Sequence, residues 1–141
     1  MTLIRKALLI ALLALPLSAQ QGFHLDPVVS AEAGGLFNAA GEASTTIDIS
    51  IGDGTFSGDL AVQAFASAGT SVCTYFVKGS LRAAPTGTEW VDLTAEKSCL
   101  GANDERLHFF NVRLVRSLQI SLGATLTGGT SVTFAIQGMA R

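Results

Sequence analysis

Charged residues, proline, histidine and aromatic residues are all scarce in this sequence of 141 residues. Charged residues make up 14% and hydrophobic residues 48%, which excludes an intrinsically disordered chain. The three prolines exclude a proline-rich linker, and the 15 glycines follow no triplet period, which excludes collagen. The formal net charge of -2 indicates no basic surface, so we expect no nucleic-acid partner.

Motifs that carry chemistry are equally scarce. The sequence has no His-x-x-x-His or Cys-x-x-Cys pair, no Gly-x-Ser-x-Gly elbow and no phosphate-binding glycine loop. His24 lies near Asp26 and is expected to be solvated, and His108 to be a surface-facing or hydrogen-bonded side chain rather than a base. The aspartates and glycines of residues 52–59 indicate a turn rather than a calcium loop. We therefore expect no enzyme, no metal site and no cofactor.

The N-terminus has the composition of a secretory signal peptide. Arg5 and Lys6 precede an apolar run over residues 7–17, and small residues follow at Ser18 and Ala19. The run is shorter than the roughly 20 residues that cross a bilayer as a helix. Residues 1–19 are predicted to be a signal peptide or, alternatively, a retained N-terminal helix. Cleavage would give an exported, periplasmic or extracellular protein.

The two cysteines, Cys73 and Cys99, indicate a disulfide if the protein is exported. The alternative is a pair of separate buried thiols, because spacing alone does not show whether two side chains meet.

The rest of the chain divides into an arm and a β domain. Residues 20–43 show no sustained period and are interrupted by glycine and proline, which predicts a flexible arm. From residue 44 hydrophobic residues alternate with polar ones between turn signals, which predicts an all-β fold, a small antiparallel β-sandwich over residues 44–141. The connection over residues 125–130 is expected to be a closing β-hairpin. The expected strands lie at residues 47–51, 60–65, 72–77, 90–93, 107–112, 118–122 and 132–136.

Two aromatic residues are candidates for binding a glycan. Trp90 follows a turn and Tyr75 lies in an apolar strand, and the two rings are expected to offer a platform on which a sugar ring stacks. The alternative for Trp90 is a core position at the start of a strand.

Residues 74–138 carry a resemblance to bacteriophage virion proteins. The segments are Phe76-Val77-Lys78-Gly79-Ser80-Leu81, then Thr86-Gly87-Thr88-Glu89-Trp90-Val91-Asp92-Leu93-Thr94, and later Val115-Arg116-Ser117-Leu118-Gln119-Ile120 and Thr127-Gly128-Gly129-Thr130-Ser131-Val132-Thr133-Phe134. The first two segments are also similar to discoidin-like carbohydrate-binding modules.

The resemblance implies a jelly-roll-like sandwich that works by surface contact. It implies a virion structural protein of a head, tail or surface decoration, with residues 20–43 as a docking arm and other protein subunits as partners in a homo-oligomer or virion lattice. The alternative is an exported carbohydrate-binding or adhesion module with a glycan as its partner.

Overall fold

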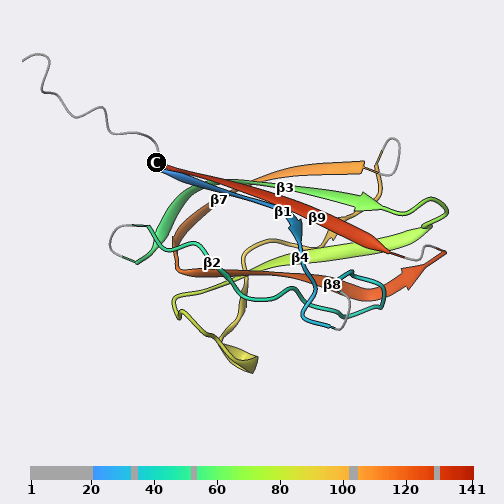
Figure 1. Cartoon of the computed structure of the whole chain (residues 1–141), viewed down its shortest axis with the longest axis horizontal. Helices are drawn as coiled ribbons and strands as arrows, with labels where there is room; N and C mark the ends of the chain where they lie inside the picture. The colour runs from blue at the N-terminus through green and yellow to red at the C-terminus, as the bar shows by residue number, and fades with distance from the viewer. Residues whose placement is uncertain (1–20, 33–34, 52–53, 102–104, 129–130) are drawn as a thin grey trace, which may run out of the picture.

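The computed structural model of the chain describes residues 21–32, 35–51, 54–101, 105–128 and 131–141 (Figure 1). Within these ranges the chain folds into two antiparallel sheets that pack face to face as a β-sandwich. The all-β prediction is confirmed. The prediction for residues 1–19 lies outside the described residues.

The first sheet has the strand order β1-β9-β3-β7. The second has the order β2-β8-β4-β5, with β6 also paired to β4. Most connections therefore cross from one sheet to the other, whereas β4, β5 and β6 follow one another within the second sheet. The strands are β1 (Gly22–Val28), β2 (Ile47–Asp48), β3 (Phe56–Ala66), β4 (Val72–Ser80), β5 (Val91–Asp92), β6 (Lys97–Ser98), β7 (Glu105–Val115), β8 (Ser117–Thr127) and β9 (Val132–Ala140), and a short 3-10 helix η1 spans Gly87–Glu89.

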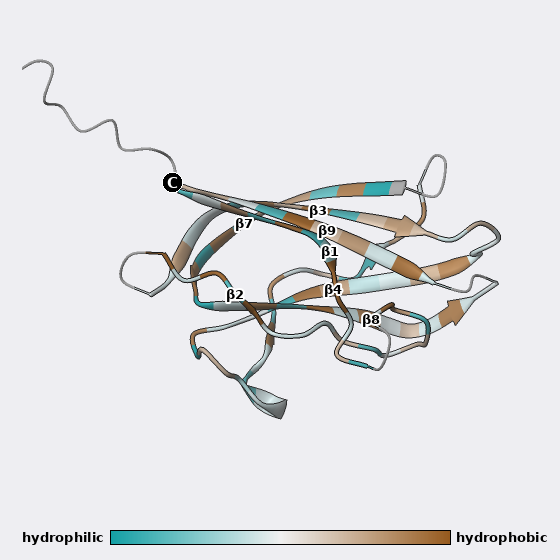
Figure 2. Cartoon of the chain, viewed as in Figure 1, coloured by the Kyte–Doolittle hydropathy of each residue, from teal (hydrophilic) through white to brown (hydrophobic). Residues whose placement is uncertain are grey.

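The core forms between the sheets because hydrophobic and polar residues alternate along the long strands. In β3 every second residue from Phe56 to Ala66 is buried, and β9 alternates in the same way from Val132 to Gly138. Figure 2 shows this alternation as stripes along both strands. One face of each strand thus enters the core and the other remains on the surface.

The predicted arm over residues 20–43 is wrong, because much of this segment belongs to the sandwich. Strand β1 pairs with β9 from Gly22↔Met139 to Val28↔Phe134. Further along, Phe37 is completely buried and its ring packs edge-on against Phe134, with a centroid distance of 5.0 Å. The domain boundary at residue 44 is therefore also wrong, since β1 is an integral edge strand.

The predicted hairpin over residues 125–130 is also wrong. Strand β8 pairs with β4 and β2, whereas β9 pairs with β1 and β3, so the connection crosses from one sheet to the other. Residues 129 and 130 themselves lie outside the described part of the chain.

No helix in the described residues is long and apolar enough to span a membrane.

Candidate interaction surface

Strand β7 is an edge strand with one free side. Among the described strands only β3 lies beside it, paired from Phe56↔Val115 to Phe65↔Glu105. Its 11 residues make it as long as the central strands. A free edge of this length presents unpaired backbone N–H and C=O groups that can bind another strand.

Large apolar side chains project from this edge strand into solvent. Phe109 is 73% exposed and Leu107 is 49% exposed. Their register partners on β3 are Ala61 and Gln63, which lie on the outer face of the sheet. Both apolar side chains therefore lie on the outer face of the sandwich, away from the core.

The outer face beside Phe109 is hollowed. A shallow cavity of about 230 Å³ lies between Phe109 on β7, Ala61 on β3 and Met139 on β9. Met139 is also exposed. The three strands together thus offer a concave apolar surface that continues from the free edge.

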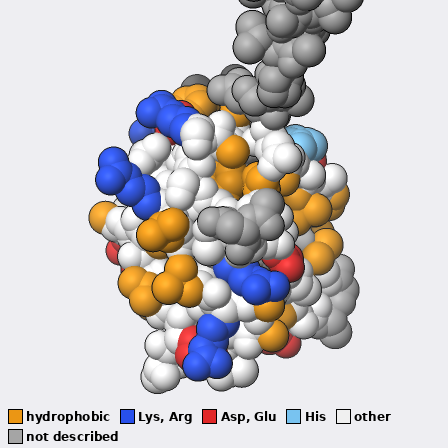
Figure 3. Space-filling model, turned by 90° about the vertical axis from the view of Figure 1, so that its left-hand side faces the viewer, with side chains coloured by type: hydrophobic (Ala, Val, Ile, Leu, Met, Phe, Trp, Pro, Cys, Tyr) orange, Lys and Arg blue, Asp and Glu red, His pale blue; other side chains and the backbone are white. Residues whose placement is uncertain are grey.

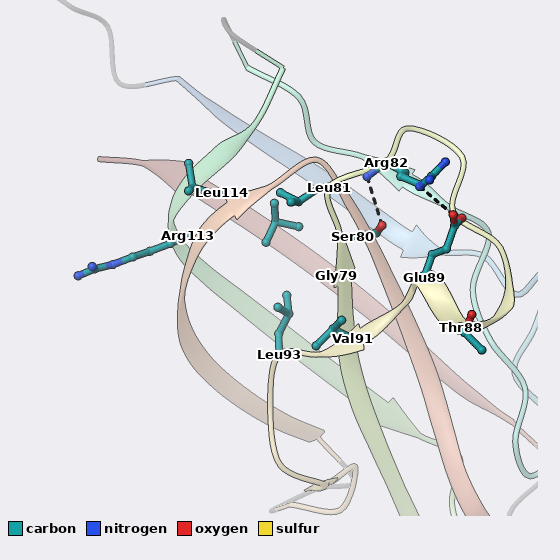
Figure 4. Close-up of a pocket in the computed structure, with 11 residues that line it drawn as sticks. Gly79, Ser80, Leu81, Arg82, Thr88, Glu89, Val91, Leu93, Arg113 and Leu114 are labelled. Carbon is teal, nitrogen blue, oxygen red and sulfur yellow. Dashed lines mark hydrogen bonds and ion pairs between the residues drawn. The ribbon is translucent and has the colours of Figure 1, made fainter.

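A larger groove lies at the end of β7. It has a volume of about 660 Å³ and is walled by apolar side chains from β5, from β7 and from the segments that follow β4 and β5 (Figure 4). We call it the edge groove. Its lining residues are Gly79, Ser80, Leu81, Arg82, Thr88, Glu89, Val91, Leu93, Arg113, Leu114 and Val115.

The floor of the edge groove forms because Leu93 packs over Gly79. A Cβ at Gly79 would lie 2.7 Å from Cδ1 of Leu93, so a larger residue here would require the Leu93 side chain to shift. The Leu93 N–H donates to the Val77 carbonyl at 2.8 Å, which holds the segment after β5 against β4.

The charged groups of the edge groove lie at its rim. The Nε of Arg82 is 2.7 Å from the Oε1 of Glu89, so these two charges satisfy one another. Arg113 is exposed and its side chain extends away from the groove in Figure 4. The end of the molecule that lies at the left in Figure 1 shows hydrophobic side chains among Lys and Arg side chains (Figure 3).

Leu114 has a backbone conformation that is unusual for leucine. Its φ is 53°, in the left-handed region, where the Cβ costs about 1–2 kcal/mol. The Leu114 N–H donates to Oγ of Ser57 at 2.9 Å, which stabilises the turn. The side chain is nevertheless 62% exposed at the groove wall. A strained, exposed leucine contributes little to the core, and strain of this kind concentrates at functional positions.

The structure does not bring the two predicted glycan-binding residues together. Tyr75 is 0% exposed, and its ring packs edge-on against Phe134 at a centroid distance of 5.1 Å. The idea that Tyr75 stacks on a glycan is therefore wrong, because its ring lies in the core. Trp90 is half-buried where η1 meets β5, apart from Tyr75. Trp90 therefore offers a glycan one partly exposed ring, without the second ring of a platform.

Tyr75 is a core residue with a polar tip. Burial raises the pKa of its hydroxyl, and the nearby positive charge of Arg106 opposes this only weakly. Among the described residues its hydroxyl has no hydrogen-bond partner. The hydroxyl is therefore neutral at physiological pH.

His108 faces inward from β7 rather than outward. Its ring stacks on Phe110 at a centroid distance of 6.3 Å, and its Nε2 lies 3.3 Å from the Ser98 carbonyl oxygen. Desolvation lowers the pKa of His108, and the positive charges of Lys97 and Arg106 lower it further. These contacts make the ring neutral and structural. The hydrogen-bonded alternative for His108 is confirmed.

Acidic and metal-ligating side chains do not converge in the described part of the chain. No group of three His, Cys, Asp or Glu residues is placed to hold a metal ion there. Asp59 instead accepts hydrogen bonds from Asn111 at 3.0 Å and from Arg141 Nε at 2.7 Å. The Asn111 hydrogen bond, followed by Arg141, lowers the pKa of Asp59. His24 is exposed on the outer face of β1.

The predicted disulfide is confirmed. Cys73 on β4 is bonded to Cys99, with a Cα–Cα distance of 5.3 Å. The Cys99 N–H also donates to the Cys73 carbonyl at 3.0 Å. Because Cys99 follows β6 and precedes β7, the bond fixes the approach to the edge strand.

Comparisons with solved structures find only weak similarities. No family model matches the chain, and no curated protein matches it. A structure of the infectious bursal disease virus Gx strain is 12% identical, with a TM-score of 0.44, over 86% of this chain and 32% of that chain. The tobacco streak virus coat protein is 10% identical, with a TM-score of 0.38, over 88% of this chain and 86% of that chain.

A further weak similarity is to part of a bacterial enzyme. The cycloalternan-forming enzyme from Listeria monocytogenes is 20% identical, with a TM-score of 0.38. The match covers 87% of this chain and 11% of that one. The chain thus spans about a third of the bursal disease virus chain and about a tenth of the enzyme.

Proposed function

We propose that this protein is a non-enzymatic structural subunit that binds other protein subunits through β7, its outer-face neighbours and the edge groove. The observation that carries the proposal is the exposure of Phe109 and Leu107 on a long edge strand with a free side. We call this region the β7 surface. Its members are Ala61, Leu107, Phe109, Met139 and the lining of the edge groove.

The β7 surface has a reason to be covered. Burying one large apolar side chain completely contributes about 1.5–3 kcal/mol, and Phe109 and Leu114 are each more than half exposed. An uncovered apolar edge strand also invites aggregation. A specific protein partner removes both costs, whereas water does not.

The edge groove fits an apolar protein side chain better than a small substrate. Small-molecule sites combine apolar walls with a few polar groups that converge on the ligand. Here the facing walls are Leu81, Val91 and Leu114, and the nearby charges of Arg82 and Glu89 are already paired. The groove thus offers burial but few free polar contacts.

Three features support a location for the assembly. The resemblance of residues 74–138 to bacteriophage virion proteins supports a virion surface, and the signal-like segment over residues 1–19 supports an exported particle. The disulfide between Cys73 and Cys99 fits an oxidising environment.

The test compares two matched substitutions in producing cells. Phe109→Ser alters the β7 surface, and Val29→Ser alters a residue that is 43% exposed beyond the opposite edge strand β1. Folding of both variants is checked by circular dichroism and thermal unfolding. We expect the wild type and Val29→Ser to sediment in large complexes and Phe109→Ser to sediment as a small species. Equal sedimentation of all three proteins would reject the proposal.

A further inference from the structure

We infer that residues 95–99 form a redox-controlled strap, which the disulfide between Cys73 and Cys99 locks over one side of β4 and which opens when that bond is reduced. The strap contains β6 and ends at Cys99. The inference goes beyond the proposed function and does not depend on it, because it concerns the opening of the strap and not the partner of the β7 surface.

Strand β4 has one side that only short segments cover. On its other side it pairs with β8 along its whole length. On the side that faces away from β8, its described partners are β5, which pairs at Lys78 and Gly79, and β6, which pairs at Thr74 and Tyr75. Each of these two partners has only two residues. The cover of β4 is therefore made of two separate pieces.

The piece that contains β5 is held by packing and by hydrogen bonds. Leu93 packs over Gly79, and the Leu93 N–H donates to the Val77 carbonyl at 2.8 Å. The Val77 N–H in turn donates to Oγ1 of Thr94 at 3.2 Å. These contacts hold residues 91–94 against β4 without help from the disulfide.

The strap has a single buried side chain, and that side chain is the cysteine. Cys99 is 0% exposed, whereas the other four residues of the strap, all described by the structure, are exposed or half-buried. Leu100, the next residue, is half-buried. Local stability follows the amount of buried apolar surface, so the strap depends mainly on its covalent bond to Cys73.

Polar contacts between the strap and its surroundings lie at the surface. Oγ1 of Thr74 donates to Oε1 of Glu96 at 2.5 Å, and Nε2 of His108 lies 3.3 Å from the Ser98 carbonyl oxygen. Both contacts are exposed, so water competes with each of them. Such contacts position the strap but stabilise it only weakly once the disulfide is gone.

Reduction is an exchange with a dithiol. A thiolate of the dithiol attacks one of the two sulfur atoms, the bond between Cys73 and Cys99 breaks, and a mixed disulfide forms. The second thiol of the reagent then releases the protein, which gains two electrons and two protons as two thiols, while the dithiol becomes a disulfide.

Opening of the strap turns part of β4 into a free edge. Thr74 and Tyr75 then lose their strand partner on one side and keep their place beside β8. Unpaired groups at a sheet edge can bind another strand. The closed disulfide therefore keeps the second sheet from adding strands, in addition to stabilising the domain.

The first test is hydrogen–deuterium exchange of the full chain, measured by mass spectrometry with the bond closed and with the bond reduced. Because both cysteines are buried, the reduced protein is prepared with a dithiol in urea and refolded with the dithiol present. Circular dichroism checks that it is folded. We expect the strap to exchange about tenfold faster or more after reduction, while β3 and β9 remain protected over the time in which the strap exchanges fully.

The second test is alkylation of the reduced protein by iodoacetamide, with the modified positions mapped by mass spectrometry. Val77→Cys provides the matched control, because position 77 is 0% exposed on the same strand but lies beneath the piece that contains β5. We expect Cys99 to be alkylated about tenfold faster or more than the cysteine introduced at position 77, because only the strap opens locally.

Two results would overturn the inference. If reduction leaves the exchange of the strap unchanged, or makes all strands exchange together with it, the bond does not control a local opening. If Cys99 and position 77 are alkylated at equal rates, the thiols are reached only when the whole chain unfolds. Neither result bears on the β7 surface, which the sedimentation of Phe109→Ser tests separately.

Discussion

The disulfide is the feature whose energetic contribution the structure defines best. Cys73 and Cys99 are both buried, and the bond joins the centre of the second sheet to the segment that enters β7. The informative perturbation is the double substitution Cys73→Ala and Cys99→Ala. Replacing both residues leaves no single free thiol to form wrong pairs.

The expected magnitude follows from the length of the closed loop. The two cysteines are 26 positions apart, and the chain-entropy relation for a loop of this size gives about 3.5 kcal/mol at 25 °C. This amount is a large part of the stability of a small domain, which is about 5–15 kcal/mol. The melting temperature should fall by about 10–15 °C.

Urea unfolding of the oxidised wild type, the reduced wild type and the double alanine variant measures the effect. The reduced wild type is the control, because it retains both sulfur atoms and loses only the bond. We expect the two altered proteins to be less stable than the oxidised one by similar amounts. A loss below about 1 kcal/mol in both would refute the reasoning that the loop restricts the unfolded chain.

Three further predictions concern single side chains. Gly138→Ala should destabilise the protein by about 1–3 kcal/mol and loosen β1, because a Cβ there would overlap the ring of Phe23. Urea unfolding and limited proteolysis check this, and an unchanged urea midpoint would contradict it. Leu114→Gly should be at least as stable as the wild type, because glycine adopts a positive φ without strain, yet it should bind partners less well. A loss of more than about 1 kcal/mol in the free energy of unfolding would contradict this prediction. Desolvation and the charges of Lys97 and Arg106 hold the pKa of His108 below its ordinary value of 6.5, so its contribution to stability is complete above pH 6.5 and is lost as the pH falls through 6.5 towards the lower folded value. Urea unfolding at several pH values should therefore show a steeper acid loss for the wild type than for His108→Gln, and a steeper loss for the variant would contradict it.

Much of the fold could be predicted because local alternation reports burial. The alternating residues at 118–122 and 132–136 lie in β8 and β9, as expected. Strand β1 could not be predicted, because Pro27 and Gly22 interrupt its local pattern. Its stability comes from pairing with β9, more than 100 positions away in the sequence. Long-range pairing of this kind leaves no local signal.

The candidate surface was harder to predict than the strands. Leu107 and Phe109 are apolar and flank His108, a pattern that favours an inward position for the two apolar residues. In the structure they face solvent and His108 faces inward. Alternation shows that two faces exist, but it does not show which strand lies at an edge. The exposure of these residues is itself the signal of an interaction surface.

The account rests on the claim that the β7 surface contacts protein in the assembled state. Photo-cross-linking in producing cells tests this most directly, with benzoylphenylalanine placed at Phe109 or, as the control, at Val29. We predict protein adducts at position 109, identified by mass spectrometry as a defined partner, and far fewer at position 29. The absence of protein adducts at position 109, in a folded protein that cross-links no more than the control, would contradict the account.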